Sequence, residues 1–341
     1  EISCSLVGSE MCIRDSLGNA LVDILALLKS DECIAETGLM KGGMQLIDED
    51  KLLKLNNLFK DFDTTMASGG SAANAISGLS CMGIPCGMIG KIGCDSYGSF
   101  YRHDMENSGV AVHLLEGNLP SGCAMTLITP DGERTFGTYL GASATLTAEE
   151  LHRSMFEGYD LLHIEGYLVQ DPALIRRAVE LAKEAGLRIS LDLASYNVVR
   201  ENYDFFHELI PNYIDIVFAN EEESLAYTGK IPEESVREIG RQCEVAVVKC
   251  GSHGSLVVRG DEYVEVEAVP ANVIDTTGAG DLYAAGFLYG LLNGYSLSVA
   301  GEIGSELSGR VIEITGTKMS EATWAEIKLK VSEIIAGTVV G

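Results

Sequence analysis

Short apolar runs alternate with helical patterns along most of the chain from about residue 67 onward. The apolar runs predict strands at 87–92, 161–164, 188–193, 215–219, 245–249 and 255–259. Apolar residues at helical spacing predict helices at 71–82, 172–185, 221–228 and 234–242, and a mainly helical tail from 280 to about 336. Strands that are apolar at nearly every position are covered on both faces. We therefore expect an α/β fold with a doubly wound, mostly parallel sheet flanked by helices.

Two segments, 25–48 and 112–140, interrupt this rhythm with short alternating runs, and the second contains a Pro-Asp-Gly turn at 130–132. We expect them to form a small β-sheet inserted into the α/β domain. A sheet inserted beside the carboxyl ends of parallel strands is well placed to act as a lid. The core is then expected at 17–24, 49–111 and 141–341.

Residues 1–16, EISCSLVGSEMCIRDS, do not fit this pattern. They have neither an initiating Met nor a basic segment before an apolar run, so they do not resemble a signal peptide. They also alternate poorly for a buried strand. We interpret residues 1–16 as an atypical, non-native N-terminus joined to a natural chain that resumes near Leu17.

Charge and cysteine usage narrow the class of protein. The 341 residues include 24 Lys and Arg against 50 Asp and Glu, a net charge of −26. Such an acidic surface disfavours nucleic acid and anionic membranes as partners, and no apolar run is long enough to span a membrane. Nine scattered cysteines without a C-x-x-C pair indicate reduced thiols and a cytoplasmic protein. His163, on an apolar strand, is expected to be a hydrogen-bonded core residue.

The stretch NVIDTTGAGDLYAAGFLYGLL, 272–292, places Asp281 at a glycine-rich turn before a long apolar helical pattern. Free amides at a helix start attract anions, and glycines let a phosphate approach closely. An aspartate that simply caps the helix is an equally weighted alternative. However, the turn holds more small residues than a cap needs and follows a strand-like segment. It is neither a Walker A motif nor a dinucleotide fingerprint, because Tyr283 stands where the last glycine would be.

The motif DTTGAGD, 275–281, closely resembles the C-terminal signature of the ribokinase-like (PfkB) carbohydrate and nucleoside kinase family. ASGGSAANAISGL, 67–79, resembles the N-terminal signature, and the resemblance extends from about Leu17 to about Trp324. It implies phosphoryl transfer from ATP with Mg²⁺, and K⁺ in many members. It assigns the general base to Asp281 and the anion hole to the turn that contains Thr277, Gly278, Ala279 and Gly280. Asp275, with the loop near Gly316, resembles the monovalent-cation site.

The same resemblance assigns the contacts to the acceptor. Asn19 and Asp23, in LGNALVDILA, would bind hydroxyls of a diol, and Gly69, Gly70 and Asn74 would touch the acceptor. On the residues alone, the first two are turn and cap residues and the others mark a closely packed helix. The family's first strand should precede Leu17 inside the sheet, where residues 1–16 lie.

Two further motifs would bind the nucleotide. Asn220 and Glu223, in FANEEES, form an ordinary capping pattern, and the resemblance places them in the magnesium and phosphate shell. KCGSHG, 249–254, resembles the loop that approaches the β-phosphate and ribose through Gly251 and Gly254. Many relatives carry a hydroxyl residue where Lys249 stands, so Lys249 either reaches phosphate as a point charge or is solvated.

The residues of the predicted lid indicate which acceptor to expect. Arg134 is either a surface charge of a hairpin or a guanidinium that meets the phosphates on closure. A nucleoside needs an apolar, partly aromatic slot, whereas a sugar needs mainly hydroxyl partners. The lid segments most resemble the bacterial adenosine kinase-like branch, with Gln45 at a base-facing position and Leu46, Phe136 and Tyr139 in the slot, although the aromatic residues could equally form the core of the lid.

We expect a nucleoside as acceptor, adenosine first. A sugar kinase that acts on ribose, fructose or 2-keto-3-deoxygluconate is the alternative, and a catalytically silent regulator that binds sugar or nucleotide is an alternative of another class. Asp281 and the intact glycine turn argue against the regulator. The sequence leaves open whether the lid forms a homodimer.

Overall fold

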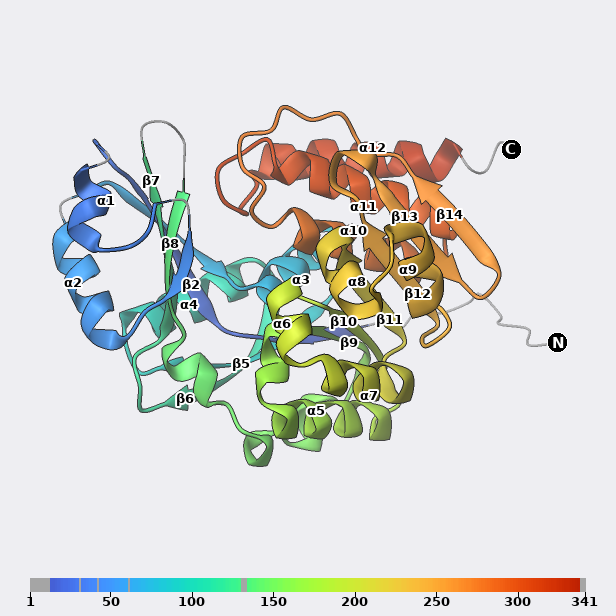
Figure 1. Ribbon diagram of the computed structural model, residues 1–341, viewed down its shortest axis with the longest axis horizontal. Helices are drawn as coiled ribbons and strands as arrows, with labels where there is room; N and C mark the ends of the chain where they lie inside the picture. The colour runs from blue at the N-terminus through green and yellow to red at the C-terminus, as the bar shows by residue number, and fades with distance from the viewer. Residues whose placement is uncertain (1–12, 31, 42, 61, 130–133, 338–341) are drawn as a thin grey trace.

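The computed structural model describes residues 13–337 except 31, 42, 61 and 130–133, and it contains two β-sheets (Figure 1). The larger sheet has nine strands in the order β14 (Glu262–Val266), β13 (Ser255–Arg259), β12 (Val245–Lys249), β11 (Ile216–Asn220), β10 (Arg188–Asp192), β9 (Tyr159–Glu165), β1 (Ile13–Leu17), β5 (Cys86–Gly93) and β6 (Val110–Gly117). Neighbours from β12 to β6 are parallel, and β13 and β14 add an antiparallel edge. The doubly wound, mostly parallel sheet is therefore present, and the six predicted strands all lie in it.

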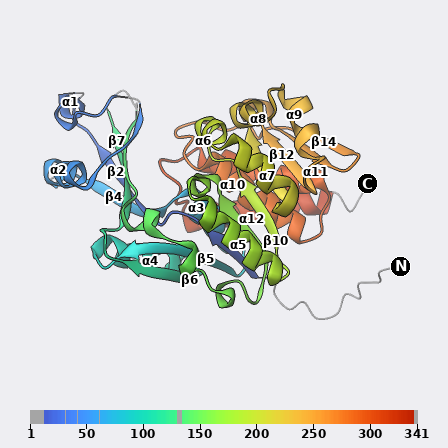
Figure 2. The ribbon, with the colours of Figure 1, turned by 60° about the horizontal axis from the view of Figure 1, so that its bottom comes forward.

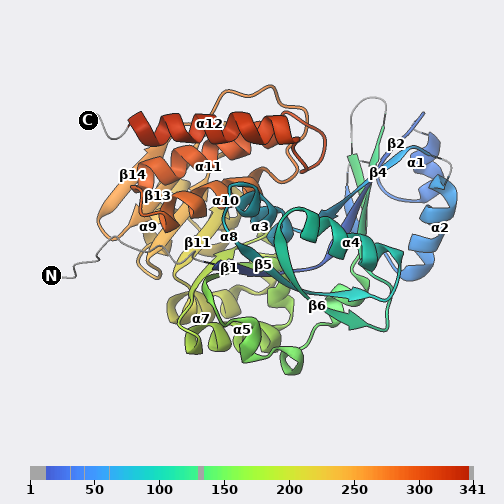
Figure 3. The ribbon, with the colours of Figure 1, turned by 180° about the vertical axis from the view of Figure 1, so that it is seen from behind.

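Helices cover both faces of the large sheet (Figure 3). One face carries α3 (Ser71–Cys81), α4 (Ser96–Asn107), α10 (Ala279–Leu292), α11 (Leu297–Val311) and α12 (Glu321–Gly337). The other carries α5 (Pro172–Glu184), α6 (Tyr196–Glu201), α7 (Tyr203–Tyr213), α8 (Glu221–Thr228) and α9 (Pro232–Ile239). Along β11, Ile216 and Phe218 belong to the first core, and Val217 and Ala219 belong to the second. This strand is apolar throughout because alternate side chains enter two separate cores.

The smaller sheet forms the lid and stands beside the large sheet (Figure 2). Its order is β3 (Met44–Leu46), β8 (Arg134–Tyr139), β7 (Gly122–Ile128), β2 (Leu21–Leu27) and β4 (Thr64–Gly69). Helices α1 (Glu32–Thr37) and α2 (Glu49–Phe59) pack on one of its faces around Ile34, Leu55 and Phe59. The chain enters the lid just after the carboxyl ends of β1 and β6, so the lid stands at the edge where parallel strands end.

The strand pairing shows that the bounds of the lid differ from those predicted from the sequence. Residues 49–69 hold α2 and β4, which belong to the lid, and β2 already begins at Leu21. Residues 112–117 belong instead to β6, which pairs with β5 in the large sheet. Because β6 is an edge strand with partly exposed side chains, its alternation resembles that of a two-sided small sheet.

The strand expected before Leu17 lies in the middle of the large sheet, between β9 and β5. Residues 13–16 of the atypical segment form most of it, and residues 1–12 lie outside the described residues. Asp15 and Ser16 are fully buried there. One carboxylate oxygen of Asp15 accepts a hydrogen bond from the backbone amide of Ser16 at 2.9 Å, and the other has no partner. Burial raises the pKa of Asp15 well above its ordinary value.

Asp15 is expected to destabilise the fold at neutral pH. Because its native pKa is raised, the folded protein binds the proton more tightly, and the free energy of unfolding falls as pH rises above about 3.9. Asp15→Asn should therefore raise the free energy of unfolding at pH 7 by about 1–3 kcal/mol, and the gain should vanish near pH 4. Urea unfolding at both pH values measures it.

Asp160→Asn is the matched control, since Asp160 is exposed on the adjacent strand β9 and should change stability little. A less stable Asp15→Asn variant at pH 7 would contradict the expected cost of the buried carboxylate.

No helix in the described part of the chain is long and apolar enough to cross a membrane.

Candidate active site

Two cavities meet at the start of α10. The larger, about 840 Å³, is lined by residues from β11 and β12, the loop 251–254, residues 268–271 and the first turns of α10. The smaller, about 530 Å³, lies between the lid, the start of α3 and α6. Ala279 and Gly280 line the larger cavity and Thr277 lines the smaller one. The glycine-rich turn therefore separates the two cavities.

No side chain caps the start of α10, although the backbone amide of Ala279 donates to the carbonyl of Thr276 at 3.2 Å. Gly278 is the residue before the helix, has a φ of 75°, and no side chain caps the helix start. A Cβ on Gly278 would lie 2.5 Å from Cγ2 of Thr317, so this position requires glycine for both conformation and space. The turn therefore has the glycine-rich form that the predicted anion site needs, and Asp281 does not cap the helix.

The strand expected before this turn is absent from the described chain. Residues 267–277 form a loop in which Val273 and Ile274 are 61% and 58% exposed. The backbone amides of Ile274 and Asp275 donate to the carbonyl of Ile312 at 2.8 and 3.1 Å, so α11 rather than a strand holds this segment. Two β-branched residues suggested a strand, but in the described structure they pair with no strand.

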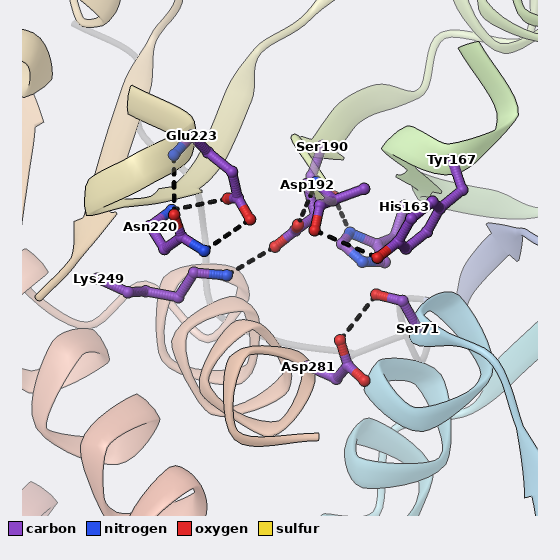
Figure 4. Close-up of polar contacts among 10 residues, drawn as sticks. Ser71, His163, Tyr167, Ser190, Asp192, Asn220, Glu223, Lys249 and Asp281 are labelled. Atoms are coloured by element: carbon purple, nitrogen blue, oxygen red, sulfur yellow. Dashed lines mark hydrogen bonds and ion pairs between the residues drawn. The ribbon is translucent and has the colours of Figure 1, made fainter. Parts of the chain in front are cut away.

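Asp281 points out of α10 toward the start of α3 (Figure 4). Its two carboxylate oxygens accept hydrogen bonds from Oγ of Ser71 at 2.7 Å and from Nδ2 of Asn74 at 2.9 Å. Burial raises the pKa of Asp281, and these two hydrogen bonds oppose the rise. The carboxylate is therefore oriented by two neutral donors and keeps its basicity.

Asn19 and Asp23 line the smaller cavity beside Asp281. A Cβ on Gly69 would overlap the carboxylate of Asp23, and a Cβ on Gly70, whose φ is 95°, would overlap the carbonyl oxygen of Asn19. The paired glycines are thus needed for the close approach of the two polar residues. Burial, reinforced by Asp281, raises the pKa of Asp23 to about 7.

Glu165, at the end of β9, is a site residue that the sequence analysis missed. Oε1 accepts from the backbone amide of Asn19 at 2.8 Å and from Asn19 Nδ2 at 2.6 Å, and Oε2 accepts from the amide of Ala72 at 3.1 Å. Its side chain is buried, and burial raises its pKa to about 7. A single acidic residue closing an apolar strand was the signal available in the sequence.

Asp192, at the end of β10, was also missed. It forms an ion pair of 2.8 Å with Lys249, whose ammonium group would lie 2.9 Å from a Cβ built on Gly280 (Figure 4). Burial opposes both charges, but their attraction prevails, so the pKa of Asp192 is lowered and that of Lys249 is raised. Lys249 is therefore not solvated, and its charge stands beside the glycine turn.

Asn220 and Glu223 form the capping box of α8. The Asn220 side chain accepts from the amide of Glu223 at 2.8 Å, and both Glu223 oxygens accept from Asn220 nitrogens at 2.7 Å. Burial, reinforced by Asp192, raises the pKa of Glu223 to about 7. Of the residues predicted to bind the nucleotide, Asn220, Lys249, Gly251 and Gly254 line the larger cavity, whereas Glu223 is not among its lining residues and Thr277 lines the smaller cavity.

Arg134 reaches from the lid to the loop before α10. Its guanidinium forms an ion pair with Asp275 and donates to Oγ1 of Thr277 at 3.2 Å. Asp275 also accepts from the backbone amides of Thr277 at 2.8 Å and Gly316 at 2.7 Å. The structure thus brings together the loops predicted to form the cation site, and places Arg134 on the same carboxylate.

The lid residues predicted for a base slot are only partly beside the smaller cavity. Leu46 lines it, whereas Gln45, one position earlier, is not among the lining residues, and its Nε2 is buried without a partner. Thr138 lines it, whereas its neighbour Tyr139 is 8% exposed and packs in the core. Adjacent residues of a strand face opposite ways, so an error of one position reverses the assignment.

Phe136 shares a face of β8 with Thr138 but does not line the cavity. His163, as predicted, is a core residue, since Nδ1 is 2.8 Å from Oγ of Ser190 and burial lowers its pKa to about 4.

Several known proteins resemble this chain in sequence and in fold. The model of the pfkB family carbohydrate kinases matches residues 35–324. The adenosine kinase of Sinorhizobium meliloti has a TM-score of 0.82 and 34% sequence identity, over 94% of this chain and 100% of that one. The 5-dehydro-2-deoxygluconokinase of Shouchella clausii is 31% identical over 282 residues, 78% of this chain and 86% of its own length. An uncharacterized sugar kinase of Archaeoglobus fulgidus is 29% identical over 244 residues, 71% of this chain and 96% of its own length.

The fold is therefore that of a ribokinase-like α/β kinase. The chain belongs to the pfkB family of carbohydrate kinases. It is a phosphotransferase with an alcohol group as acceptor, and its family uses ATP, generally with Mg²⁺, to phosphorylate small sugars or nucleosides.

Removal of one partner of the buried ion pair between Asp192 and Lys249 should lower the free energy of unfolding strongly. Asp192→Asn leaves the ammonium buried beside Gly280 without its counter-charge, and we expect a loss of about 3–5 kcal/mol in the free energy of unfolding. The double variant Asp192→Asn/Lys249→Met should recover most of this stability. Urea unfolding of the three proteins measures both effects.

Glu208→Gln provides the control, because it breaks the exposed pair with Arg176 and should change the free energy of unfolding little. Equal losses from Asp192→Asn and Glu208→Gln would show that the buried pair has no special cost.

Proposed function

We propose that the protein transfers the γ-phosphoryl group of MgATP to a primary hydroxyl of a nucleoside, adenosine first, with Asp281 as general base. The observation that carries the proposal is the position of the turn 278–280 between the two cavities. The larger cavity suits ATP, and the smaller suits the acceptor. A phosphoryl group that passes from one to the other must cross the uncapped amides of α10 beside Asp281.

In the proposed reaction, Asp281 takes the proton of the acceptor hydroxyl as its oxygen attacks the γ-phosphorus. The bond to the oxygen that bridges the β- and γ-phosphates breaks, and ADP leaves. The amides at 278–280 stabilise the charge on the transferring group, and the ammonium of Lys249 adds a fixed positive charge at the same turn. Arg134 would leave Asp275 to meet the phosphates from the lid, and the lid would exclude water.

The described residues contain no group of three or more His, Cys, Asp or Glu that could hold a metal by itself. Each oxygen of Glu223 accepts one hydrogen bond from Asn220 and keeps a further lone pair. Glu223 would help to hold a magnesium ion whose other ligands would be phosphate oxygens and water. When bound, it would neutralise charge on the phosphates.

A monovalent cation such as K⁺ at Asp275 is a separate part of the proposal. Asp275 is 4% exposed and meets the loop at Gly316, which supports a cation there. The guanidinium of Arg134 contacts the same carboxylate, so the two positive charges would compete. A homodimer through the lid stays a prediction.

The lining of the smaller cavity supports a nucleoside. Asn19 and Asp23 offer polar partners for a vicinal diol near Asp281. The rest of the wall is largely apolar, with Leu21, Leu46, Leu140, Leu146, Leu168, Leu174 and Val198. A free sugar would leave much of this surface uncovered, whereas a base would cover it. A sugar kinase remains the alternative, because Gln45, Phe136 and Tyr139 do not line the slot.

Replacement of Asp281, the proposed general base, tests the reaction. Asp281→Asn should lower turnover by roughly 10²- to 10⁴-fold, since the amide accepts hydrogen bonds but no proton. In the unsubstituted protein, turnover should fall on acidification at a pH above the ordinary pKa of an aspartate, because burial raises the pKa of Asp281. Release of ADP with MgATP and adenosine, ribose or fructose measures both.

A thermal midpoint close to that of the unsubstituted protein controls for folding of Asp281→Asn. Near-normal turnover by this variant would rule out Asp281 as the base.

Replacement of the diol partners tests the acceptor site. Asn19→Ala and Asp23→Ala should each raise KM for the acceptor about 10-fold or more while KM for ATP changes little. Acceptor affinity should also weaken below about pH 7, where Asp23 binds a proton and loses acceptor capacity. Steady-state kinetics across pH check both, and an unchanged KM for the acceptor would remove the diol contact from the proposal.

A further inference from the structure

We propose that the acceptor cavity selects uncharged acceptors and rejects acceptors that carry a carboxylate, such as sugar acids. This inference rests on the proposed function and narrows its substrate class. Four carboxylates line the cavity, those of Asp23, Glu165, Asp171 and Glu201. No Lys, Arg or His side chain lines it among the residues that the structure describes.

The helix starts in the cavity wall are already occupied by the protein's own acidic groups. Asp171 caps α5 by accepting from the amides of Ala173 and Leu174 at 3.0 and 3.1 Å. Glu165 accepts from the amide of Ala72 at the start of α3. Each of these two helix starts therefore already holds an acidic side chain, which would repel a carboxylate of the acceptor. The start of α10 is uncapped, but the transferring phosphate needs it.

The basic residues around the cavity are paired as well. Lys318 lies 3.1 Å from the carboxylate of Asp104 and donates to Oγ of Ser68 at 2.8 Å. The guanidinium of Arg134 is bound by Asp275, and Lys249 is bound by Asp192. A carboxylate in the cavity would have to break one of these pairs to gain a counter-charge.

An acidic acceptor would thus lose hydration, meet like charges and receive no cation in return. Like charges brought together in an interface cost several kcal/mol. We expect kcat/KM for a carboxylated acceptor to be at least about 100-fold below that for an uncharged acceptor of similar size. The acidic relatives of the sugar alternative, such as 2-keto-3-deoxygluconate, would be excluded, while fructose and nucleosides would not.

Two matched pairs of acceptors test this selection with the full chain and MgATP. The nucleoside pair is N6-propyladenosine and N6-carboxymethyladenosine, and the sugar pair is fructose and 2-keto-3-deoxygluconate. The protein is expected to phosphorylate members of one pair. Within that pair, we expect kcat/KM for the uncharged compound to exceed that for the acid by at least about 100-fold. Equal use of both members of that pair, or a preference for the acid, would overturn the inference.

A charge reversal at the cavity rim provides the second readout. Glu201 is exposed at the end of α6 and lines the cavity. Glu201→Lys should raise kcat/KM for the acid relative to its uncharged partner by about 10-fold, because it supplies a cation and removes a like charge. Glu184→Lys, at the far end of α5, changes the net charge equally and should leave the ratio unaltered. An equal effect of both variants would show that net charge, rather than the cavity lining, sets the preference.

A binding measurement distinguishes two outcomes, a wrong prediction of acceptor charge and a wrong assignment of kinase activity. If no acceptor is phosphorylated, the kinase proposal fails, and thermal stabilisation by each member of the two pairs is measured instead. Stabilisation by the uncharged members alone would support the inference. Equal stabilisation by acid and uncharged member, or none by any of the four compounds, would overturn it.

Discussion

The packing of α3 against α10 is the contact on which the site depends. The two helices approach so closely that a Cβ on Gly78 would lie 2.8 Å from Cδ1 of Leu282 and 2.9 Å from Cβ of Ala285. This approach brings Ser71 and Asn74 within hydrogen-bonding distance of Asp281. The small residues of the first signature therefore serve both packing and chemistry, and the two interpretations of that motif hold together.

The second constraint is electrostatic. Asp281, Asp23, Glu165 and Glu223 are all acidic, and burial raises the pKa of each. Amides, neutral side-chain donors and the ammonium of Lys249 offset this concentration of negative charge. In the proposed function, a protein with a net charge of −26 would bind polyanionic ATP through the helix start of α10 and the ammonium of Lys249.

Features that depend on residues close together in the chain were predicted best from the sequence. The order of core strands and helices followed from hydrophobic period, and both signatures followed from residues close together in the chain. Glu165 and Asp192 were missed because their partners come from elsewhere: Asn19 is 146 residues from Glu165, and Lys249 is 57 residues from Asp192. Each is a single acid after an apolar strand, and only the sheet order brings it to its partner. The lid assignments for Gln45 and Tyr139 stay predictions, since neither residue lines the smaller cavity and period 2 alone does not say which face of a strand is inward.

The lid joins the core through four short chain crossings, at residues 18–20, at Gly70, at 118–121 and at 140. Besides its own apolar core, the lid shares the core of the large sheet, in which Val22, Ile24 and Tyr139 pack. Asn19 and Gly70 lie at two of the crossings. The proposed acceptor contact at Asn19 would therefore be made where the lid joins the core, so the same backbone that shapes the acceptor site also links the two parts.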